Sequence, residues 1–541
     1  MSVAKSAALA RIVDRELEEP SALAAYHEIV LFILAHPDDE EVFRAATREL
    51  RRIAVIARRL VAGGHGEDLV GTGIAHTEVV GTYSRAMARW LNTRFGAHVA
   101  IGWRDESAGP GLDEAMPLLL APVERDGLLA GQTTRRVVRQ ASGRHDELGW
   151  LLDRVDGLAD DPALNDQAWD RIALPLKWRL RSPQSSITFN RFPRRSLHFF
   201  PHRLETPQSL DDYPPPGPVR RLSVRDAQRI IDTCKAALAV RGRETDPVTV
   251  ANPGETYLYR LERGLDIAVI GMLPGRRLPI ESYFGYVAAR NRIPIAYGGG
   301  WVFFDRCEIG INVFDTYRGG ESVQALARVI GVYRSLFRPR LFTVAANQIG
   351  AGNEEAIASG AYWAYDRLGF RPTDGLLASL ADRERARRAG SPSYRSSPAI
   401  LRRLAGSRLV LRLTDDAVTE PLEVDALAQV ATRWIGEGHS GSVERARRAA
   451  IDRVVRALGI TDRDRWSPQQ RRAFEELSLL VAPIRDLARW PDRDKARVVQ
   501  VMRAKGGRQE KTYALALQRQ RRLYEAWMNL ARDAVADRAK D

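Results

Sequence analysis

The order of patterns in residues 308–372 constrains the fold more than any other feature of the chain. Residues 308–314 include β-branched side chains and are predicted to form a strand. Residues 315–322 contain a glycine pair and are predicted to form a loop. Apolar residues recur at helical spacing over 322–337, and 341–346 is a second predicted strand. This order predicts a parallel strand–helix–strand unit whose loop points at the N-terminus of a helix.

A second helix is predicted over residues 353–368. Asn353 is the expected N-cap, and Glu354 and Glu355 follow in the first turn, where the helix dipole favours negative charge. Gly369 ends the helical pattern, and Pro372 follows shortly after it.

The end of this stretch resembles the GNAT superfamily of N-acyltransferases. Residues 365–370 read YDRLGF and are similar to the Tyr-x-x-Leu-Gly-Phe-like motif that ends a helix in that family, and Asn353 matches a turn asparagine before that helix. In the family, the loop before the preceding helix holds the pyrophosphate of acyl-CoA. The loop here departs from the family pattern Arg/Gln-x-x-Gly-x-Gly/Ala in either register, and Glu321 adds a negative charge.

The resemblance implies roles for individual residues. Glu308 is the implied general base, Tyr365 is the implied acid that protonates the thiolate, and a backbone amide near Val313 is the implied donor to the thioester oxyanion. Structural alternatives stay open, with Glu308 as a strand-edge charge, Tyr365 as a core aromatic residue and Asn353 as a helix cap. The implied cofactor-binding residues are Val313, Tyr317, Arg318, Gly319, Gly320, Ser322 and Asn353.

The resemblance extends over about residues 222–374. A helix is predicted over 224–238 after Ser223, followed by strands joined by short turns, which indicates antiparallel pairing. These strands are predicted at 266–272, 283–289, 293–297 and 301–304. The expected fold class is α+β or α/β, a central GNAT-like mixed sheet with helices, flanked by mainly helical N- and C-terminal domains. The expected domains are 1–210, 219–375 and 376–541, divided first at the proline-rich segment 211–218.

The flanking regions carry weaker signals. Helices are predicted at 21–35, 40–61 and 76–95, and from residue 427 onward. Short strands are predicted at 409–413 and 421–424. Two arginine-containing segments are open to two interpretations. Residues 185–204 are predicted to form a surface hairpin, with nucleic-acid binding as the alternative, and the corner around Arg503, Lys505, Arg508 and Lys511 is predicted to be solvated, with phosphate binding as the alternative.

The segment LFILAHPDDEE, residues 31–41, resembles the His-Pro-Asp-Asp signature of zinc-dependent sugar N-deacetylases. That resemblance implies His36 and Asp39 as metal ligands and Asp38 as a base. A long helical pattern follows the motif directly, without the glycine-rich turn of that family. We therefore expect a helix N-terminus here, where acidic residues are favoured, and no metal.

Composition limits the remaining function classes. The net charge of +14 is carried mainly by arginine and admits an anionic partner, such as nucleic acid, a lipid headgroup or a phosphorylated cofactor, or else diffuse surface charge. Two distant cysteines exclude a disulfide framework, no apolar run approaches the roughly 20 residues of a membrane span, and a cytoplasmic location is expected.

The function expected from these features is acyl transfer from acetyl-CoA or another acyl-CoA to an amine acceptor, which can be a small molecule or a peptide. Two alternatives stay open. One is a non-catalytic GNAT-fold protein that binds a ligand or partner, and the other is a basic nucleic-acid-associated protein.

Overall fold

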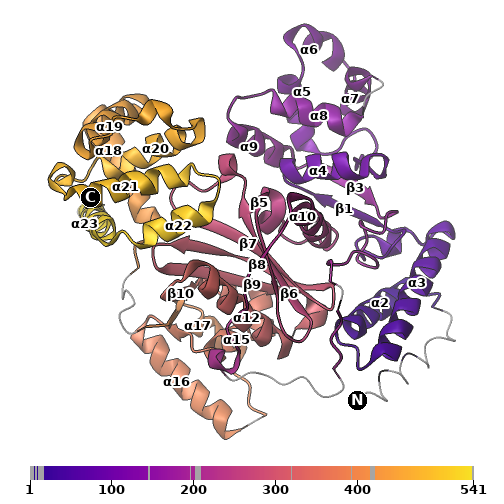
Figure 1. The fold of residues 1–541 in the computed structure, drawn as a ribbon. Helices are drawn as coiled ribbons and strands as arrows, with labels where there is room; N and C mark the ends of the chain where they lie inside the picture. Colours follow the sequence, from indigo (N-terminus) through magenta and orange to yellow (C-terminus); the bar gives the residue numbers. More distant parts are fainter. Residues whose placement is uncertain are drawn as a thin grey trace.

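The computed structural model describes residues 17–143, 146–194, 196–200, 209–318, 320–391, 393–414 and 421–538, together with Lys5 and Leu9. A large mixed sheet lies in the middle, with N-terminal helices on one side and C-terminal helices on the other (Figure 1). The mixed α/β class and the helical flanks are confirmed. Within the described ranges no helix is both long and apolar enough to cross a membrane.

The central sheet has the strand order β11-β12-β10-β9-β8-β7-β6-β5-β4. Strands β9 and β10 run parallel, and the other neighbouring strands run antiparallel. Its strands are β4 (Arg220–Arg221), β5 (Ala251–Arg260), β6 (Leu265–Met272), β7 (Ser282–Arg290), β8 (Ile293–Phe303), β9 (Arg306–Val313), β10 (Leu341–Val344), β11 (Arg371–Pro372) and β12 (Leu409–Arg412). Strand β12 confirms the short strand predicted at 409–413, and it joins this sheet from within 376–541, the region expected to be mainly helical.

Strand β8 corrects the prediction of two separate strands at 293–297 and 301–304. It runs unbroken through Gly298, Gly299 and Gly300. A Cβ at Gly299 would lie 2.4 Å from the Tyr283 ring, and one at Gly300 would lie 2.3 Å from the Tyr333 ring. The glycines therefore make room for aromatic rings that pack directly against the backbone of β8, and they do not form a turn.

Helices cover both faces of the sheet. Gly285 of β7 lies close to Pro247 of α11, and its cross-strand partner in β8 is Gly299. The next residue of β8, Gly300, lies against Tyr333 of α12. Because consecutive strand residues point to opposite faces, α11 and α12 lie on opposite sides. The helices of this part are α10 (Val224–Ala239), α11 (Asp246–Thr249), α12 (Gly320–Phe337), α13 (Ala346–Ile349), α14 (Glu354–Ser359), α15 (Ala361–Arg367), α16 (Gly375–Gly390) and α17 (Pro398–Leu404).

Local signals predicted some of these helices well and others poorly. Ser223 caps α10 by accepting a hydrogen bond from the Asp226 amide, as its position before the helical pattern indicates. The single helix predicted over 353–368 is wrong, because Gly360 adopts a left-handed conformation with φ of 65° and divides it into α14 and α15. The second predicted strand ends at Val344, where the chain turns into α13.

The N-terminal part contains a sheet that the helical pattern did not predict. Strands β1 (Glu78–Thr82), β2 (Val99–Ile101) and β3 (Pro175–Arg179) pair antiparallel in the order β1-β3-β2. The helix predicted over 76–95 is wrong in its first half, which forms β1. The surrounding helices are α2 (Pro20–Ala35), α3 (Glu40–Ala62), α4 (Arg85–Phe95), α5 (Pro110–Leu119), α6 (Pro122–Leu129), α7 (Thr134–Ser142), α8 (Glu147–Asp156) and α9 (Pro162–Ile172).

The surface hairpin predicted over 185–204 is also wrong in the described residues of that segment. Those residues contain no strand, and Ser186, Thr188 and Phe192 are buried. The Arg191 guanidinium donates to the backbone carbonyls of Ile187, Thr188 and Asn190, so this arginine holds the segment together instead of facing a partner. Residues 195 and 201–208 lie outside the described part of the chain.

The C-terminal part is a helical bundle with its own hydrophobic core. The end of β8 contributes Phe303, whose ring stacks on Trp527 at 6.4 Å. Residues 421–424 are not a strand, and the first helix begins at Val424. The helices are α18 (Val424–His439), α19 (Val443–Leu458), α20 (Pro468–Val481), α21 (Asp492–Lys505), α22 (Glu510–Gln518) and α23 (Arg521–Arg538).

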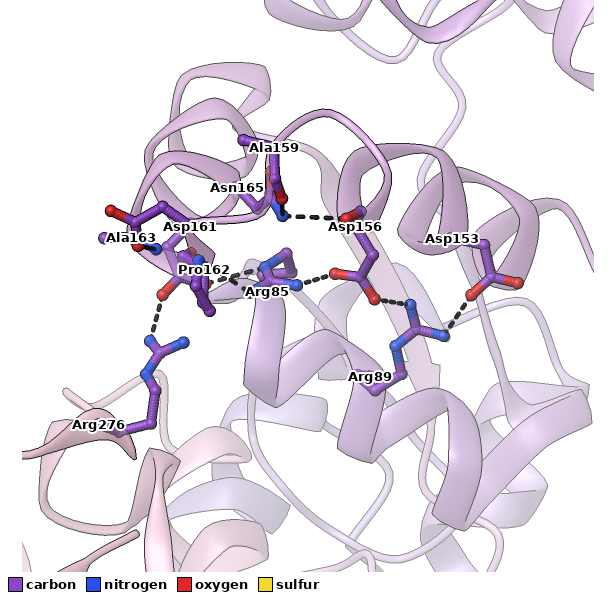
Figure 2. A network of polar contacts seen from close by, with 11 residues as sticks. Arg85, Arg89, Asp153, Asp156, Ala159, Asp161, Pro162, Ala163, Asn165 and Arg276 are labelled. Atoms are coloured by element: carbon purple, nitrogen blue, oxygen red, sulfur yellow. Dashed lines mark hydrogen bonds and ion pairs between the residues drawn. The ribbon is translucent and has the colours of Figure 1, made fainter. Parts of the chain in front are cut away.

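Charged pairs organise the N-terminal helices and attach them to the sheet. Figure 2 shows Arg89 of α4 between Asp153 and Asp156 of α8, at 2.7 and 2.5 Å. Arg85 forms ion pairs with Asp156 and Asp166. Asp166 also forms an ion pair with Arg276, which lies in the loop between β6 and β7. The network therefore ends on a residue of the central part.

Candidate functional site

Strands β9 and β10 part at the centre of the sheet. Their pairing runs from Arg306 opposite Leu341 to Glu308 opposite Thr343. Strand β9 continues to Val313, whereas β10 ends at Val344 and the chain turns into α13. A cavity of about 360 Å³ lies beside the far end of β9. Its walls come from the end of β9, the first turns of α12, and helices α14 and α15.

The structure brings five of the sequence-predicted residues to this cavity. They come from three separate segments, the end of β9, the start of α12 and the α14–α15 region, and they are Val313, Arg318, Ser322, Asn353 and Tyr365. The other predicted residues lie elsewhere or are not described. Gly319 falls outside the described residues, and Gly320 is the first residue of α12.

The side chains of Glu308 and Tyr317 do not line the cavity. Glu308 lies where β9 is still paired with β10, and its carboxylate is 3.5 Å from Arg306. Tyr317 is 1 % exposed and lies beneath the loop, with its ring 6.2 Å from Phe32 of α2. Burial raises the pKa of the Tyr317 phenol well above its ordinary value. Tyr317 therefore supports the loop from below.

Asn353 caps α14, as its place before two acidic residues predicts. Its side-chain oxygen accepts a hydrogen bond from the Ala356 amide at 3.0 Å. Its side-chain nitrogen donates to the Asn347 carbonyl at 3.1 Å. The cap thus fixes both the start of α14 and the loop that closes this wall of the cavity.

Tyr365 provides a buried hydroxyl at the cavity. The residue is 2 % exposed and its ring packs edge-on against Phe370 at 5.5 Å. Within the part of the chain that the structure describes, its oxygen has no hydrogen-bond partner of normal geometry. Burial raises the pKa of this phenol well above its ordinary value, and the Ile311 backbone amide partly opposes that rise. The hydroxyl therefore keeps its proton at neutral pH, and the same shift makes it a weaker acid than an exposed tyrosine.

Two carboxylates hold the arginine at the cavity. The Arg318 guanidinium pairs with Glu355 and, at 2.7 Å, with Asp315. Arg243 approaches the same two acids, at 3.9 Å from Glu355 and 3.3 Å from Asp315. The hydrogen bond from Arg318 lowers the pKa of Glu355. An anion entering here competes with Glu355 for Arg318.

Two helices that are distant in sequence, α2 and α10, support the loop that leads into the cavity. Thr316 donates to the Glu28 carboxylate of α2, and Arg241 at the end of α10 lies over the Phe314 ring at 4.4 Å. These two contacts fix the segment between β9 and α12 to the helices behind it.

Some cavity residues were not predicted as site residues. Gln348 of α13 and Trp363 of α15 reach the cavity only because the chain bends at Val344 and at Gly360. Glu355 was visible in the sequence as a first-turn acid, but its pairing with Arg318 joins positions that are distant in the chain. The pattern of apolar residues in the sequence does not indicate either of these bends.

The His-Pro-Asp-Asp segment forms a helix start. Asp39 caps α3 by accepting a hydrogen bond from the Val42 amide at 2.8 Å, as expected. Asp38 pairs with Lys5 at 2.5 Å. Among the described residues, no group of three or more histidine, cysteine or acidic side chains is arranged to hold a metal ion.

Comparisons of this chain with models of known protein families, with curated proteins and with solved structures found no match.

Proposed function

We propose that the central part of this chain is a GNAT-like N-acyltransferase that moves an acyl group from an acyl-CoA to an amine. The observation that supports this proposal is the cavity where β9 and β10 part, bounded by the N-terminal turn of α12 and by Tyr365. A helix N-terminus leaves backbone amides without intrahelical partners, and these favour an anion.

The residues at the cavity fit such a donor. The first turn of α12, with the Ser322 side chain, would hold the pyrophosphate, and Arg318 would add positive charge. The Tyr365 hydroxyl supplies a proton donor in the wall that α15 contributes, beside Ala361, Ala364 and Arg367. The bound donor would supply a thioester, whose carbonyl carbon is open to attack by an amine.

The reaction forms a C–N bond and breaks a C–S bond. The amine loses one proton, and the departing sulfur gains one. Tyr365 is the group placed to give the second proton. Glu308 shares a face of β9 with Asn312, which lines the cavity, but lies four residues away, roughly 13 Å along the strand. Its role as base therefore requires water between the carboxylate and the amine.

A second candidate is a non-catalytic protein that binds a ligand through the same cavity. The position of Glu308 outside the cavity and the pairing of Arg318 with Glu355 favour this alternative. In that case ligand binding persists and no acyl group is transferred.

Thermal unfolding with acetyl-CoA tests the proposal. A ligand at about 100 times its dissociation constant adds about 2.7 kcal/mol to the free energy of unfolding. Gly320→Asp, which adds bulk and negative charge at the first residue of α12, should abolish the stabilisation, and Glu321→Gln should keep or increase it. An unchanged shift in Gly320→Asp would place the ligand elsewhere. Stabilisation without release of free thiol in the presence of amines would favour the non-catalytic alternative. No shift with any acyl-CoA at millimolar concentration would refute the acyltransferase proposal and also favour that alternative.

A further inference from the structure

A second, larger cavity lies between the central sheet and the C-terminal helices. Its volume is about 900 Å³, within the range of small-molecule sites. One wall comes from β5 and the loop after β6, through Asn252, Gly254 and Pro274, and the other comes from α20, α21 and the start of α22. The cavity is separate from the acyl-transfer site, because the two share no lining residue.

A wide bulge in β5 shapes the first wall. The pairing of β5 with β6 runs from Ala251 opposite Met272 to Thr256 opposite Ile270, so residues 252–255 stand opposite Gly271 alone. The bulge directs Glu255 at the N-terminus of α22, where its carboxylate accepts hydrogen bonds from the amides of Glu510 and Lys511 at 2.9 and 2.8 Å. It also exposes Asn252 and Gly254 to the cavity. Bulges of this kind redirect side chains near binding sites.

The charge of the lining is strongly one-sided. Arg503 and Arg508 line the cavity, and no aspartate or glutamate is among its described lining residues. Arg503 lies over the Trp466 ring at 5.0 Å, with its nearest carboxylate, Asp462, at 3.8 Å. Among the residues that the structure describes, Arg508, Gln500 and Gln509 have no hydrogen-bond or ion-pair partner for their side chains. Elsewhere in the chain, arginines are commonly paired with acids, as Arg85 and Arg385 are.

We infer that this cavity binds a phosphate-bearing small molecule. Arginine forms strong charge-assisted hydrogen bonds with phosphate oxygens, and the side-chain amides of Gln500, Gln509 and Asn252 add neutral donors around them. Such a ligand contacts the β5 bulge and the C-terminal helices at once, so its binding holds these two parts of the chain together. The corner that the sequence predicted as a solvated turn is, on this interpretation, one wall of a binding site.

The inference is tested by calorimetric titration of the full chain with tripolyphosphate and with ATP at low salt. We expect saturable binding of at least one of them, and a higher unfolding temperature in its presence. Arg508→Gln should weaken binding by about tenfold or more, a change of about 1.4 kcal/mol. Because Arg508 is exposed and its side chain has no partner in the described residues, this variant should fold like the parent.

Arg493→Gln is the matched control, since Arg493 is an exposed arginine of α21 outside the cavity and its loss removes the same charge. It should bind both probes like the parent, and so should Gly320→Asp, because Gly320 is the first residue of α12 and does not line this cavity. Binding of tripolyphosphate alone identifies a phosphate chain as the ligand, and stronger binding of ATP identifies a nucleotide. Equal weakening by Arg493→Gln and Arg508→Gln would overturn the inference in favour of diffuse surface charge. Binding of short single-stranded RNA without binding of either probe would also overturn it.

Discussion

Arg276 and Arg277 are adjacent in the loop between β6 and β7, and their guanidinium groups bind opposite flanking parts of the chain. Arg276 pairs with Asp166 of α9 on the N-terminal side. Arg277 pairs with Glu510 of α22 at 3.3 Å on the C-terminal side, and also donates to the Gly507 carbonyl at 2.6 Å. One short loop therefore attaches both helical parts to the sheet.

The two arginines should differ sharply in their contribution to stability. The Arg277 side chain is 3 % exposed, and its removal leaves the buried carboxylates of Glu255 and Glu510 without this partner. Arg277→Ala should therefore lower the free energy of unfolding by about 3–5 kcal/mol. Arg276 and Asp166 are partly exposed, so Arg276→Ala should cost about 1 kcal/mol or less. Urea unfolding of both variants measures the difference. Equal losses would contradict the assignment of Arg277 as the buried anchor.

The C-terminal attachment should depend on pH through Glu255. Burial raises the pKa of this carboxyl from 4.5 to about 6, against the hydrogen bonds from the Lys511 and Glu510 amides. The folded chain therefore binds more protons than the unfolded chain between these values, and the stability from this group is lost as pH rises through about 6. The loss should be about 2 kcal/mol.

Glu255→Gln tests this dependence, because glutamine keeps an oxygen that can accept from the backbone amides of α22. Unfolding free energies of parent and variant are compared at pH 5 and pH 7. The parent should lose more stability between these values than the variant does. Parallel pH profiles would show that Glu255 has the same pKa in the folded and unfolded chains.

The Tyr365 hydroxyl should matter for catalysis and not for folding. It is buried and has no normal hydrogen bond within the described residues, an arrangement that costs about 1–3 kcal/mol, so Tyr365→Phe should leave the free energy of unfolding unchanged or raise it. If Tyr365 gives the proton to the thiolate, kcat should fall by about 10²–10⁴ with little change in KM for acetyl-CoA. Thiol release in the presence of an accepted amine measures kcat. A large loss of stability would instead make Tyr365 a core residue.

The sequence predicted those elements whose signals are local. Helices α10 and α12 have continuous apolar periodicity, and Asn353 precedes two acids at a helix start, so each was recognisable from its neighbours. Strand β12 was expected as a short strand, but its pairing with β10 bridges about seventy residues, and no local pattern carries that information. The residues that line the cavity could likewise be named from the sequence only in part. Ser322 and Tyr365 were named from the family resemblance and line the cavity, whereas Gln348 reaches it only through the bend after β10.

Strand β8 also depends on contacts that the local sequence does not show, and a glycine substitution tests these contacts directly. Its three glycines resemble a turn in sequence, but in the sheet a Cβ at Gly298 would lie 2.2 Å from the Gly310 carbonyl oxygen. Because a backbone atom cannot move aside easily, Gly298→Ala should destabilise the chain by about 1–3 kcal/mol. Gly275→Ala is the control, since nothing lies within 4 Å of its added Cβ. Equal unfolding midpoints for the two variants would mean that residues 298–300 form a turn after all.

The pairing of Arg318 with Glu355 predicts an unusual gain of affinity. Arg318 is the arginine closest in sequence to the start of α12, and Glu355 and Asp315 both hold it. A pyrophosphate that binds at α12 must compete with Glu355 and also meets its negative charge. Glu355→Gln removes that charge and weakens the hold on Arg318, so the affinity for acetyl-CoA should rise by about three- to tenfold, corresponding to about 0.7–1.4 kcal/mol.

Glu354→Gln is the matched control, because Glu354 lies in the same helical turn but pairs with Arg402 and does not line the cavity. Titration calorimetry compares the two variants with the parent. Weaker binding in Glu355→Gln would show that Glu355 positions Arg318 for the ligand, and equal gains in both variants would reduce the effect to net charge.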